Sequence, residues 1–89
     1  MSRASRVEGE SLAAEIRTFL QRELRLDEAD LGAGDELISR GLVDSVDLVK
    51  IVTFLEETLG VEIPDRDIGP NHFESIERIV AYVESRQPR

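Results

Sequence analysis

Apolar residues recur at helical spacing in three segments of this 89-residue chain, and this periodicity is the feature that most constrains the fold. In the segment after Ser45, apolar residues stand four, three and four positions apart, which places them on one face of a helix. They are Leu48, Val52, Leu55 and Leu59, with Ile51 widening the stripe. Gly60 is suited to end this helix in a left-handed conformation. No segment shows the strict alternation that indicates a strand, so the pattern predicts an all-α fold.

The other two stripes predict the first and the last helix. The first helix is expected to follow Ser11, and the last to follow Ser75, whose side chain is suited to cap it. The first stripe consists of Leu12, Ile16, Phe19, Leu20 and Leu24, and the last of Ile76, Ile79, Val80 and Val83. Residues 65–68 are expected to form a single helical turn, and Phe73 to be buried in the core. The predicted fold is a four-helix bundle with three main helices and a short third one.

Between Arg25 and Val43 the helical period is lost and glycines appear, which predicts a long loop between the first two main helices. Four leucines are expected to anchor this loop to the core: Leu26, Leu31, Leu37 and Leu42. Loops of this length are uncommon in compact domains unless they have a function. Residues 1–10 are polar and without periodicity, so we expect a disordered tail there, a folded domain over residues 11–86 and a second disordered tail at residues 87–89.

Composition excludes several kinds of protein. The chain contains no cysteine, so it can form neither a disulfide nor a thiolate metal site. No apolar run is long enough to span a bilayer, and the first ten residues lack the apolar core of a secretion signal. We therefore expect a monomeric cytoplasmic protein that is not inserted in a membrane.

Negative charge is concentrated in one part of the chain. Eleven basic and nineteen acidic residues give a net charge of −8, and residues 27–80 hold fourteen of the acidic and only four of the basic residues. Such a field repels phosphate backbones and anionic lipid surfaces. It favours protein partners with basic patches and argues against nucleic acid as a ligand, although acidity also keeps a small domain soluble.

Asp44 and Ser45 stand at the predicted start of the second helix. Asp44 is suited to be the N-cap residue, which would make Ser45 the first helical residue with its hydroxyl towards solvent. A catalytic serine is not expected, because Ser45 lacks the flanking glycines of a nucleophile elbow. The single histidine, His72, lies in a Pro-Asn-His sequence far along the chain and is interpreted as a loop residue.

A metal site is not expected either. Asp65, Asp67 and Asn71 form a short acidic segment, but Gly69 and Ile76 stand where a calcium-binding EF-hand needs an oxygen ligand and a glutamate. No glycine-rich phosphate loop and no basic groove is present, so nothing in the sequence supports nucleotide binding.

The residues around Ser45 resemble the acyl carrier protein family, which also includes peptidyl and aminoacyl carriers. The resemblance lies in the run 41–49 (GLVDSVDLV) and continues in residues 54–57 (FLEE), 60–61 (GV) and 63–65 (IPD), so that it covers about residues 11–84. It implies the same helical fold and a 4'-phosphopantetheine arm on Ser45, whose thiol holds an acyl group as a thioester. It also implies that Asp44 faces the transferase and its bound metal. The family most often has leucine after the serine, whereas this chain has Val46. Valine keeps the position apolar, so the difference concerns the choice of partner more than the modification itself.

The resemblance implies a discrete, non-catalytic acyl carrier protein. Its partners would be a phosphopantetheinyl transferase, an acyl-loading or adenylating enzyme and a downstream synthase or transferase. The residues after Gly60 are more similar to discrete carriers of polyketide or nonribosomal pathways than to fatty acid carriers. Two alternatives stay open: an aminoacyl or peptidyl carrier loaded by an adenylating ligase, and an acidic helical interaction domain without a prosthetic group.

The face of the second helix opposite its apolar stripe is expected to contact these partners. Val46 and Thr53 would form a contact strip with Lys50 on the same face, and three carboxylates would meet basic partner residues. These carboxylates belong to Asp47, Glu56 and Glu57.

Overall fold

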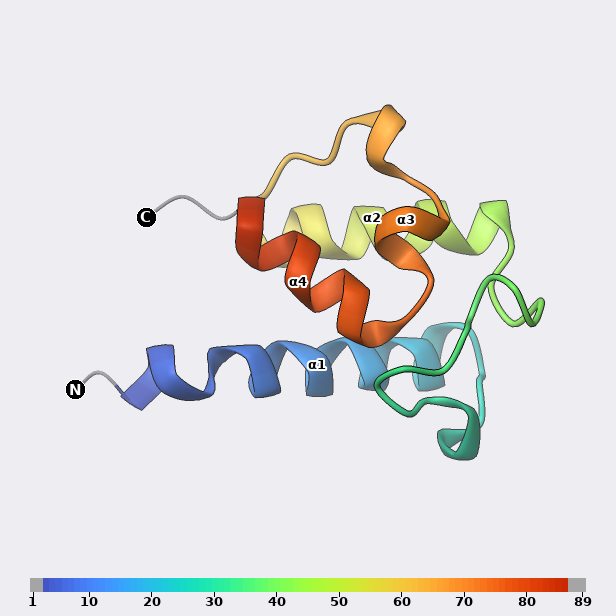
Figure 1. Cartoon of the computed structure of the whole chain (residues 1–89), viewed down its shortest axis with the longest axis horizontal. Coiled ribbons are helices and arrows are strands. Elements are labelled where there is room, and N and C mark those ends of the chain that lie inside the picture. The colour runs from blue at the N-terminus through green and yellow to red at the C-terminus, as the bar shows by residue number, and fades with distance from the viewer. Residues whose placement is uncertain (1–2, 87–89) are drawn as a thin grey trace.

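The computed structural model describes residues 3–86, with side chains from residue 11 onward. It contains α1 (Arg3–Glu23), α2 (Ser45–Leu59), α3 (Pro70–Phe73) and α4 (Ile76–Arg86), together with the 3₁₀ turns η1 (Glu28–Asp30) and η2 (Asp65–Asp67) (Figure 1). No strand occurs within residues 3–86. The predicted all-α architecture, with three main helices, one short helix and a long loop before α2, is confirmed.

Helix α1 begins earlier than predicted. It starts at Arg3, so residues 3–10 are helical, and the expectation of an irregular tail is wrong for them. A helix that is already nucleated lengthens at little cost, and arginine, glutamate and alanine are favourable helix formers. Apolar periodicity reveals only the packed part of a helix, and the stripe from which this start was predicted begins at Leu12. Residues 1–2 and the predicted C-terminal tail at 87–89 lie outside the described residues.

Helix α3 was missed by sequence reasoning, although the expected turn before it is present. The expected helical turn at residues 65–68 is the 3₁₀ turn η2, and the short α-helix lies five residues further on, at Pro70–Phe73. Pro70 is its first residue, where the fixed φ of proline suits a helix and its missing N–H is not needed. His72 therefore lies in a helix rather than in a loop. It is half-buried, and its ring centroid is 4.5 Å from that of Tyr82.

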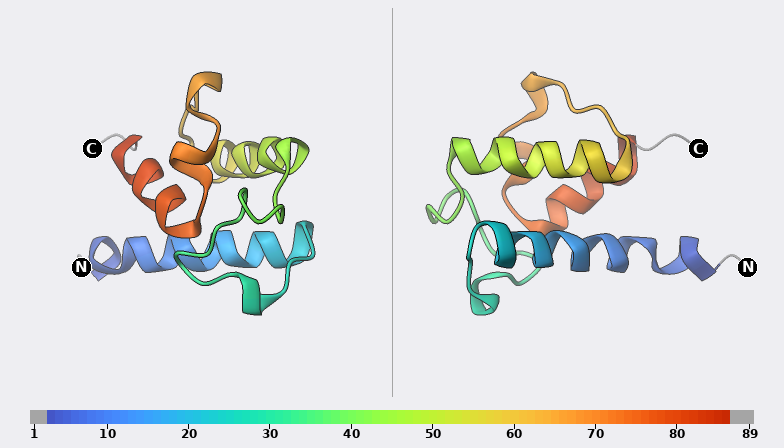
Figure 2. Two further views of the ribbon diagram at one scale, coloured as in Figure 1. Left: turned by 45° about the vertical axis from the view of Figure 1, so that its right-hand side comes forward. Right: turned by 180° about the vertical axis from the view of Figure 1, so that it is seen from behind.

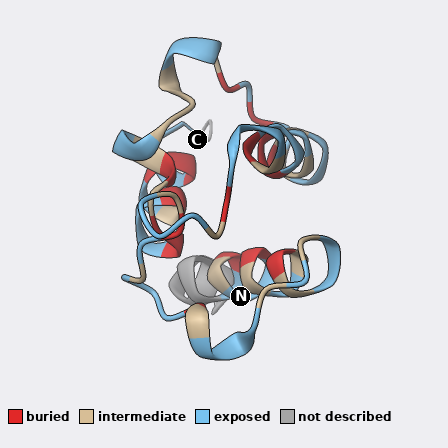
Figure 3. Ribbon diagram, turned by 90° about the vertical axis from the view of Figure 1, so that its right-hand side faces the viewer, coloured by how far each residue is buried: buried red, intermediate tan, exposed pale blue. Residues whose placement is uncertain are grey.

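The core lies between the inner faces of α1, α2 and α4 (Figure 3). Helices α1 and α2 run in opposite directions, while α4 packs against α1 and α3 (Figure 1). Phe73 is completely buried, as predicted. The largest fully buried aliphatic side chains are Ile16, Leu20, Leu31, Leu37, Ile51, Leu55, Ile76 and Ile79. The apolar stripes predicted for the three main helices thus supply most of the core.

The long loop between α1 and α2 is fastened to the rest of the domain. Leu31 and Leu37 are buried, whereas Leu26 and Leu42 are half-buried against the core. The Arg17 Nε of α1 also donates a hydrogen bond of 3.0 Å to the Leu31 carbonyl. The expectation that these four leucines anchor the loop is confirmed.

The start of α2 and the start of α1 lie at opposite ends of the molecule (Figure 1). Helix α2 begins at the end where the long loop lies, whereas α1 begins and α4 ends at the opposite end (Figures 1 and 2). With 21 residues at about 1.5 Å per residue, α1 extends over roughly 30 Å between these ends. No helix within residues 3–86 combines the length and the apolar character needed to cross a bilayer.

Tyr82 joins the turn after α2 to α4. Its hydroxyl donates a hydrogen bond of 2.6 Å to Asp67 Oδ2 in η2, and its ring lies 5.8 Å from the Arg86 guanidinium. Burial of the phenol, reinforced by the bond to Asp67, raises the pKa of Tyr82 to about 12 from its ordinary 10.0. Ionisation of this hydroxyl would break the link between η2 and α4.

We therefore expect the protein to lose stability between about pH 10 and 12. In this range the unfolded chain releases the Tyr82 proton while the folded chain keeps it, so the free energy of unfolding falls as pH rises, by at most about 1.4 kcal/mol per pH unit. Urea unfolding across this range measures the fall, and Tyr82→Phe should remove this contribution. Since Tyr82 is the only tyrosine, tyrosinate absorbance reports its pKa directly, and ionisation near pH 10 in the folded protein would contradict the prediction.

Candidate functional site

Asp44 and Asp47 fix the start of α2 by a reciprocal pair of hydrogen bonds. Asp44 Oδ1 accepts from the Asp47 N–H at 2.9 Å, and Asp47 Oδ2 accepts from the Asp44 N–H at 3.2 Å. This capping box provides acceptors for two backbone N–H groups at the start of α2, those of Asp44 and Asp47. Ser45 is consequently the first residue of α2 and is exposed, as the sequence predicted. The hydrogen bond from the Asp47 N–H lowers the pKa of the Asp44 carboxyl below its ordinary value, so Asp44 is ionised at neutral pH.

The backbone on the other side of Ser45 is equally well defined. The Leu37 carbonyl accepts hydrogen bonds from the N–H groups of Leu42 and Val43, at 2.9 and 3.0 Å. Gly41 has a φ of +77°, a left-handed conformation that glycine adopts without steric cost. Val43 is buried two residues before the serine. Ser45 therefore projects from a rigid corner between a closed loop and a capped helix.

This corner presents an exposed hydroxyl at the first position of a helix. Ser45 is a primary alcohol beside an anionic side chain at the positive end of a helix dipole. Among residues 3–86, no set of three or more histidine and acidic side chains is arranged to hold a metal ion.

One face of α2 is exposed and partly apolar. Val46 and Val49 are the large hydrophobic side chains that remain exposed within the described residues, at 63% and 60%. Thr53 lies exposed on the same face, and we call Val46, Val49 and Thr53 the α2 strip. Lys50 and Glu57 are exposed beside it. Sequence reasoning placed four of these five residues on this face but missed Val49.

Asp47 and Glu56 have structural roles that the sequence analysis did not assign. Both are half-buried. Asp47 belongs to the capping box, and Glu56 Oε2 accepts a hydrogen bond of 3.1 Å from the Ile63 N–H beyond the end of α2. Their expected contacts with basic partner residues stay predictions. Glu57 is the better candidate, because it is exposed beside the α2 strip.

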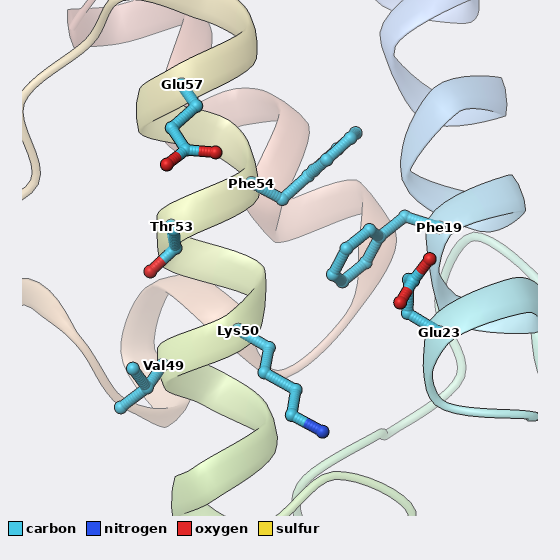
Figure 4. Close-up of a pocket in the computed structure, with 7 residues that line it drawn as sticks. All are labelled: Phe19, Glu23, Val49, Lys50, Thr53, Phe54 and Glu57. Atoms are coloured by element: carbon cyan, nitrogen blue, oxygen red, sulfur yellow. The ribbon is translucent and has the colours of Figure 1, made fainter.

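A groove lies between α2 and α1 next to this face (Figure 4). Its volume is about 420 Å³. Phe54 of α2 and Phe19 of α1 point toward each other across it, and their rings stack with centroids 4.4 Å apart (Figure 4). The remaining lining residues are Glu23, Val49, Lys50, Thr53 and Glu57. The sequence placed Phe19 on the apolar stripe of the first helix but gave no sign that its ring meets that of Phe54.

Comparison with known proteins agrees with this geometry. Residues 14–83 match the family model described as "Phosphopantetheine attachment site". The acyl carrier protein of Campylobacter lari is 33% identical over 73 residues, which are 82% of this chain and 92% of that protein. The acyl carrier protein of Helicobacter pylori strain G27 is 29% identical over 77 residues, which are 86% of this chain and 96% of that one.

The match covers most of the chain and includes Ser45, so the chain belongs to the acyl carrier protein family. It is a non-catalytic carrier that bears a phosphopantetheine arm. The chain has no cysteine, so the thiol of the arm is the only thiol in the protein once the arm is attached and before it is acylated.

A solved structure shows the same fold. One chain in a structure described as "Crystal structure of FAD-dependent dehydrogenase" superposes with a TM-score of 0.68 at 28% identity. The alignment covers 76% of this chain and 97% of that chain. The matched chain is therefore shorter than the present one.

Proposed function

We propose that Ser45 carries the 4'-phosphopantetheine arm, and that the protein delivers an acyl group held as a thioester on this arm to partner enzymes. Its placement supports the proposal, since Ser45 is exposed at the first position of α2 within the matched segment. The two other serines of that segment are engaged elsewhere. The Ser39 hydroxyl donates to Glu74, and Ser75 is buried, with its hydroxyl accepting from the Arg78 N–H at the start of α4.

Each residue of the corner would have a defined part in this function. The Ser45 Oγ would form the bond to the phosphorus of the arm, and the thiol at the far end of the arm would hold the acyl group. Asp44 and Asp47 would keep the first turn of α2 intact while the enzyme approaches. The ionised Asp44 would present negative charge to a basic or metal-containing active site.

Mass spectrometry tests the proposal. The purified chain is incubated with a phosphopantetheinyl transferase and coenzyme A, and its intact mass is measured before and after proteolysis. We expect one added phosphopantetheine per chain, located on the peptide that contains Ser45. An unchanged mass would instead favour an acidic interaction domain without a prosthetic group.

We further propose that partner enzymes dock on the α2 strip and carry basic residues that meet Glu57. Val46→Asp should lower kcat/KM for the transferase about tenfold or more, because it places an unpaired charge in the apolar contact. Glu57→Lys should cause a smaller loss, about two- to fivefold, that shrinks as salt is added, because an exposed charge acts mainly on the association rate.

Transferase kinetics across a salt series measure both effects. Glu84→Lys makes the same charge change as Glu57→Lys, but at an exposed position on α4, and serves as its matched control. Circular dichroism confirms that each variant is folded. Equal kinetics for Val46→Asp and Glu84→Lys would show that partners dock on another face.

For the pathway, we propose polyketide or nonribosomal natural-product biosynthesis, with an aminoacyl or peptidyl carrier as the alternative cargo class. The solved structure favours one further partner. A chain shorter than the present one has no room for both a carrier fold and an FAD-binding fold. We therefore propose a flavin-dependent dehydrogenase that oxidises the tethered acyl group among the partners of this chain.

Loaded protein tests this partner. The holo chain, charged with candidate acyl or aminoacyl groups, is incubated with flavin dehydrogenases encoded beside its own gene. Loss of one molecule of hydrogen from the tethered group, together with reduction of the flavin, is the expected result. Oxidation of the free acid at the same rate would count against a carrier-dependent partner.

A further inference from the structure

Glu74 links the junction of α3 and α4 to the loop that leads to Ser45. Its Oε2 accepts a hydrogen bond of 2.9 Å from the Ser39 N–H, and its Oε1 accepts one of 3.1 Å from the Ser39 hydroxyl. The backbone carbonyl of Glu74 accepts a further bond of 2.7 Å from the Leu37 N–H. Glu74 thus holds the loop at two residues, Leu37 and Ser39, and we call this set of bonds the Glu74 clamp.

The clamp is connected to the corner at Ser45 through the loop backbone. The Leu37 carbonyl accepts from Leu42 and Val43, and the Gly41 N–H donates to the Ile38 carbonyl at 3.0 Å. The Leu37 side chain is fully buried and fixed to the core, whereas Ser39 is exposed and is held by the Glu74 carboxylate. Residues 37–43 therefore form a closed turn, and the next two residues are Asp44 and Ser45.

The other polar contacts of this turn are weaker. The Arg40 guanidinium pairs with Asp30 at 3.0 Å and with Asp35 at 3.8 Å. Both pairs are solvent-exposed, and such pairs add little to the stability of a fold. The bonds to the Glu74 carboxylate are exposed as well, but they are two charge-assisted hydrogen bonds from a single residue, and they join two segments distant in sequence.

We propose that Glu74 is a positioning residue for the modification of Ser45. The inference rests on the proposed role of Ser45. An active site that encloses the hydroxyl of the first residue of α2 must also accommodate the residues before it. The Glu74 clamp holds these residues in one shape, so that the transferase meets an ordered surface on both sides of the serine.

Loosening the clamp should therefore act on binding more than on chemistry. In Glu74→Ala the Ser39 N–H and hydroxyl lose their acceptors, and only a fraction of the molecules present the loop in the competent shape. The apparent affinity falls by that fraction. We expect KM for the transferase to rise about tenfold with kcat nearly unchanged, since the bound loop is ordered again. Glu74→Gln keeps one acceptor oxygen and should restore part of the loss, and Ser39→Ala should have a small effect.

Tyr82→Phe provides the matched control. It also removes a hydrogen bond from a hydroxyl to a carboxylate, but that bond, to Asp67, links η2 to α4 and not the loop before Ser45. The stability of each variant is measured by urea unfolding, so that KM can be compared at similar losses of stability. Hydrogen exchange of the amides of residues 39–43 reports the loop without any enzyme.

The expected result is faster exchange and a raised KM in Glu74→Ala, intermediate values in Glu74→Gln and wild-type values in Tyr82→Phe. A KM that stays at the wild-type value in Glu74→Ala, or rises equally in Tyr82→Phe, would overturn the role of Glu74 while leaving Ser45 as the attachment residue. Failure of the wild-type chain to gain phosphopantetheine would overturn both proposals.

Discussion

Replacing Ser45 with alanine is expected to abolish attachment of phosphopantetheine completely while leaving the fold unchanged. The Ser45 hydroxyl would be the sole point of attachment, and alanine removes it without adding bulk. Alanine is the best helix former, and the Asp44–Asp47 capping box involves no atom of the Ser45 side chain. Helix α2 should therefore start at the same residue. The measurement is the intact mass after prolonged incubation with the transferase, with circular dichroism as a check of the fold.

Ser11→Ala is the matched control for this experiment. Ser11 is also exposed and also on a helix, but it lies on α1 outside the matched segment. This variant should be modified at the wild-type rate. A mass gain in Ser45→Ala equal to that of Ser11→Ala would show that another residue bears the arm.

The largest loss of stability is expected from Phe73→Ala. Phe73 is completely buried where α3 meets α4, and its ring centroid lies 5.7 Å from that of Tyr82. Removal of a buried phenyl ring leaves a cavity and costs about 3–5 kcal/mol. The total free energy of unfolding of a small domain is about 5–15 kcal/mol, so Phe73→Ala should be close to unfolding. Urea unfolding followed by circular dichroism measures the difference.

Phe19→Ala is the control that shows whether the loss of stability depends on how deeply the ring is buried. Phe19 is half-buried, and it stacks on Phe54 at the edge of the groove rather than inside the core. Its ring leaves a space that water can enter, so the loss of stability should be clearly smaller. Equal losses for the two variants would show that the interior around Phe73 closes over the cavity.

The sequence predicted α2 and the corner at Ser45 because their signals are local. Asp44 at one end and Gly60 at the other are residues with specific cap conformations, and the structure has both: a capping box at Asp44 and a left-handed φ of 71° at Gly60. Four apolar positions between them fixed the buried face. The exposure of Ser45 followed from the cap alone.

The remaining features depend on contacts that no local pattern records. The bond between Ser39 and Glu74 joins residues 35 positions apart, and neither residue type predicts the other. The one-turn helix α3 is too short to show a period, and residues 3–10 extend α1 beyond the apolar stripe on which its start was predicted. Val49 was missed because an apolar residue on a largely buried helix is assumed to face inward, although it lies one turn from the exposed Val46.

The separation of the two ends of the molecule decides how the protein can be immobilised. The start of α1 and the end of α4 both lie on the side of the molecule opposite the start of α2 (Figure 1). A biotin, a fluorophore or a sensor surface attached at the start of α1 would stand roughly the length of α1 away from the corner at Ser45. Surface-based binding measurements can therefore be oriented by attachment at the start of α1, with the corner at Ser45 directed towards the solution.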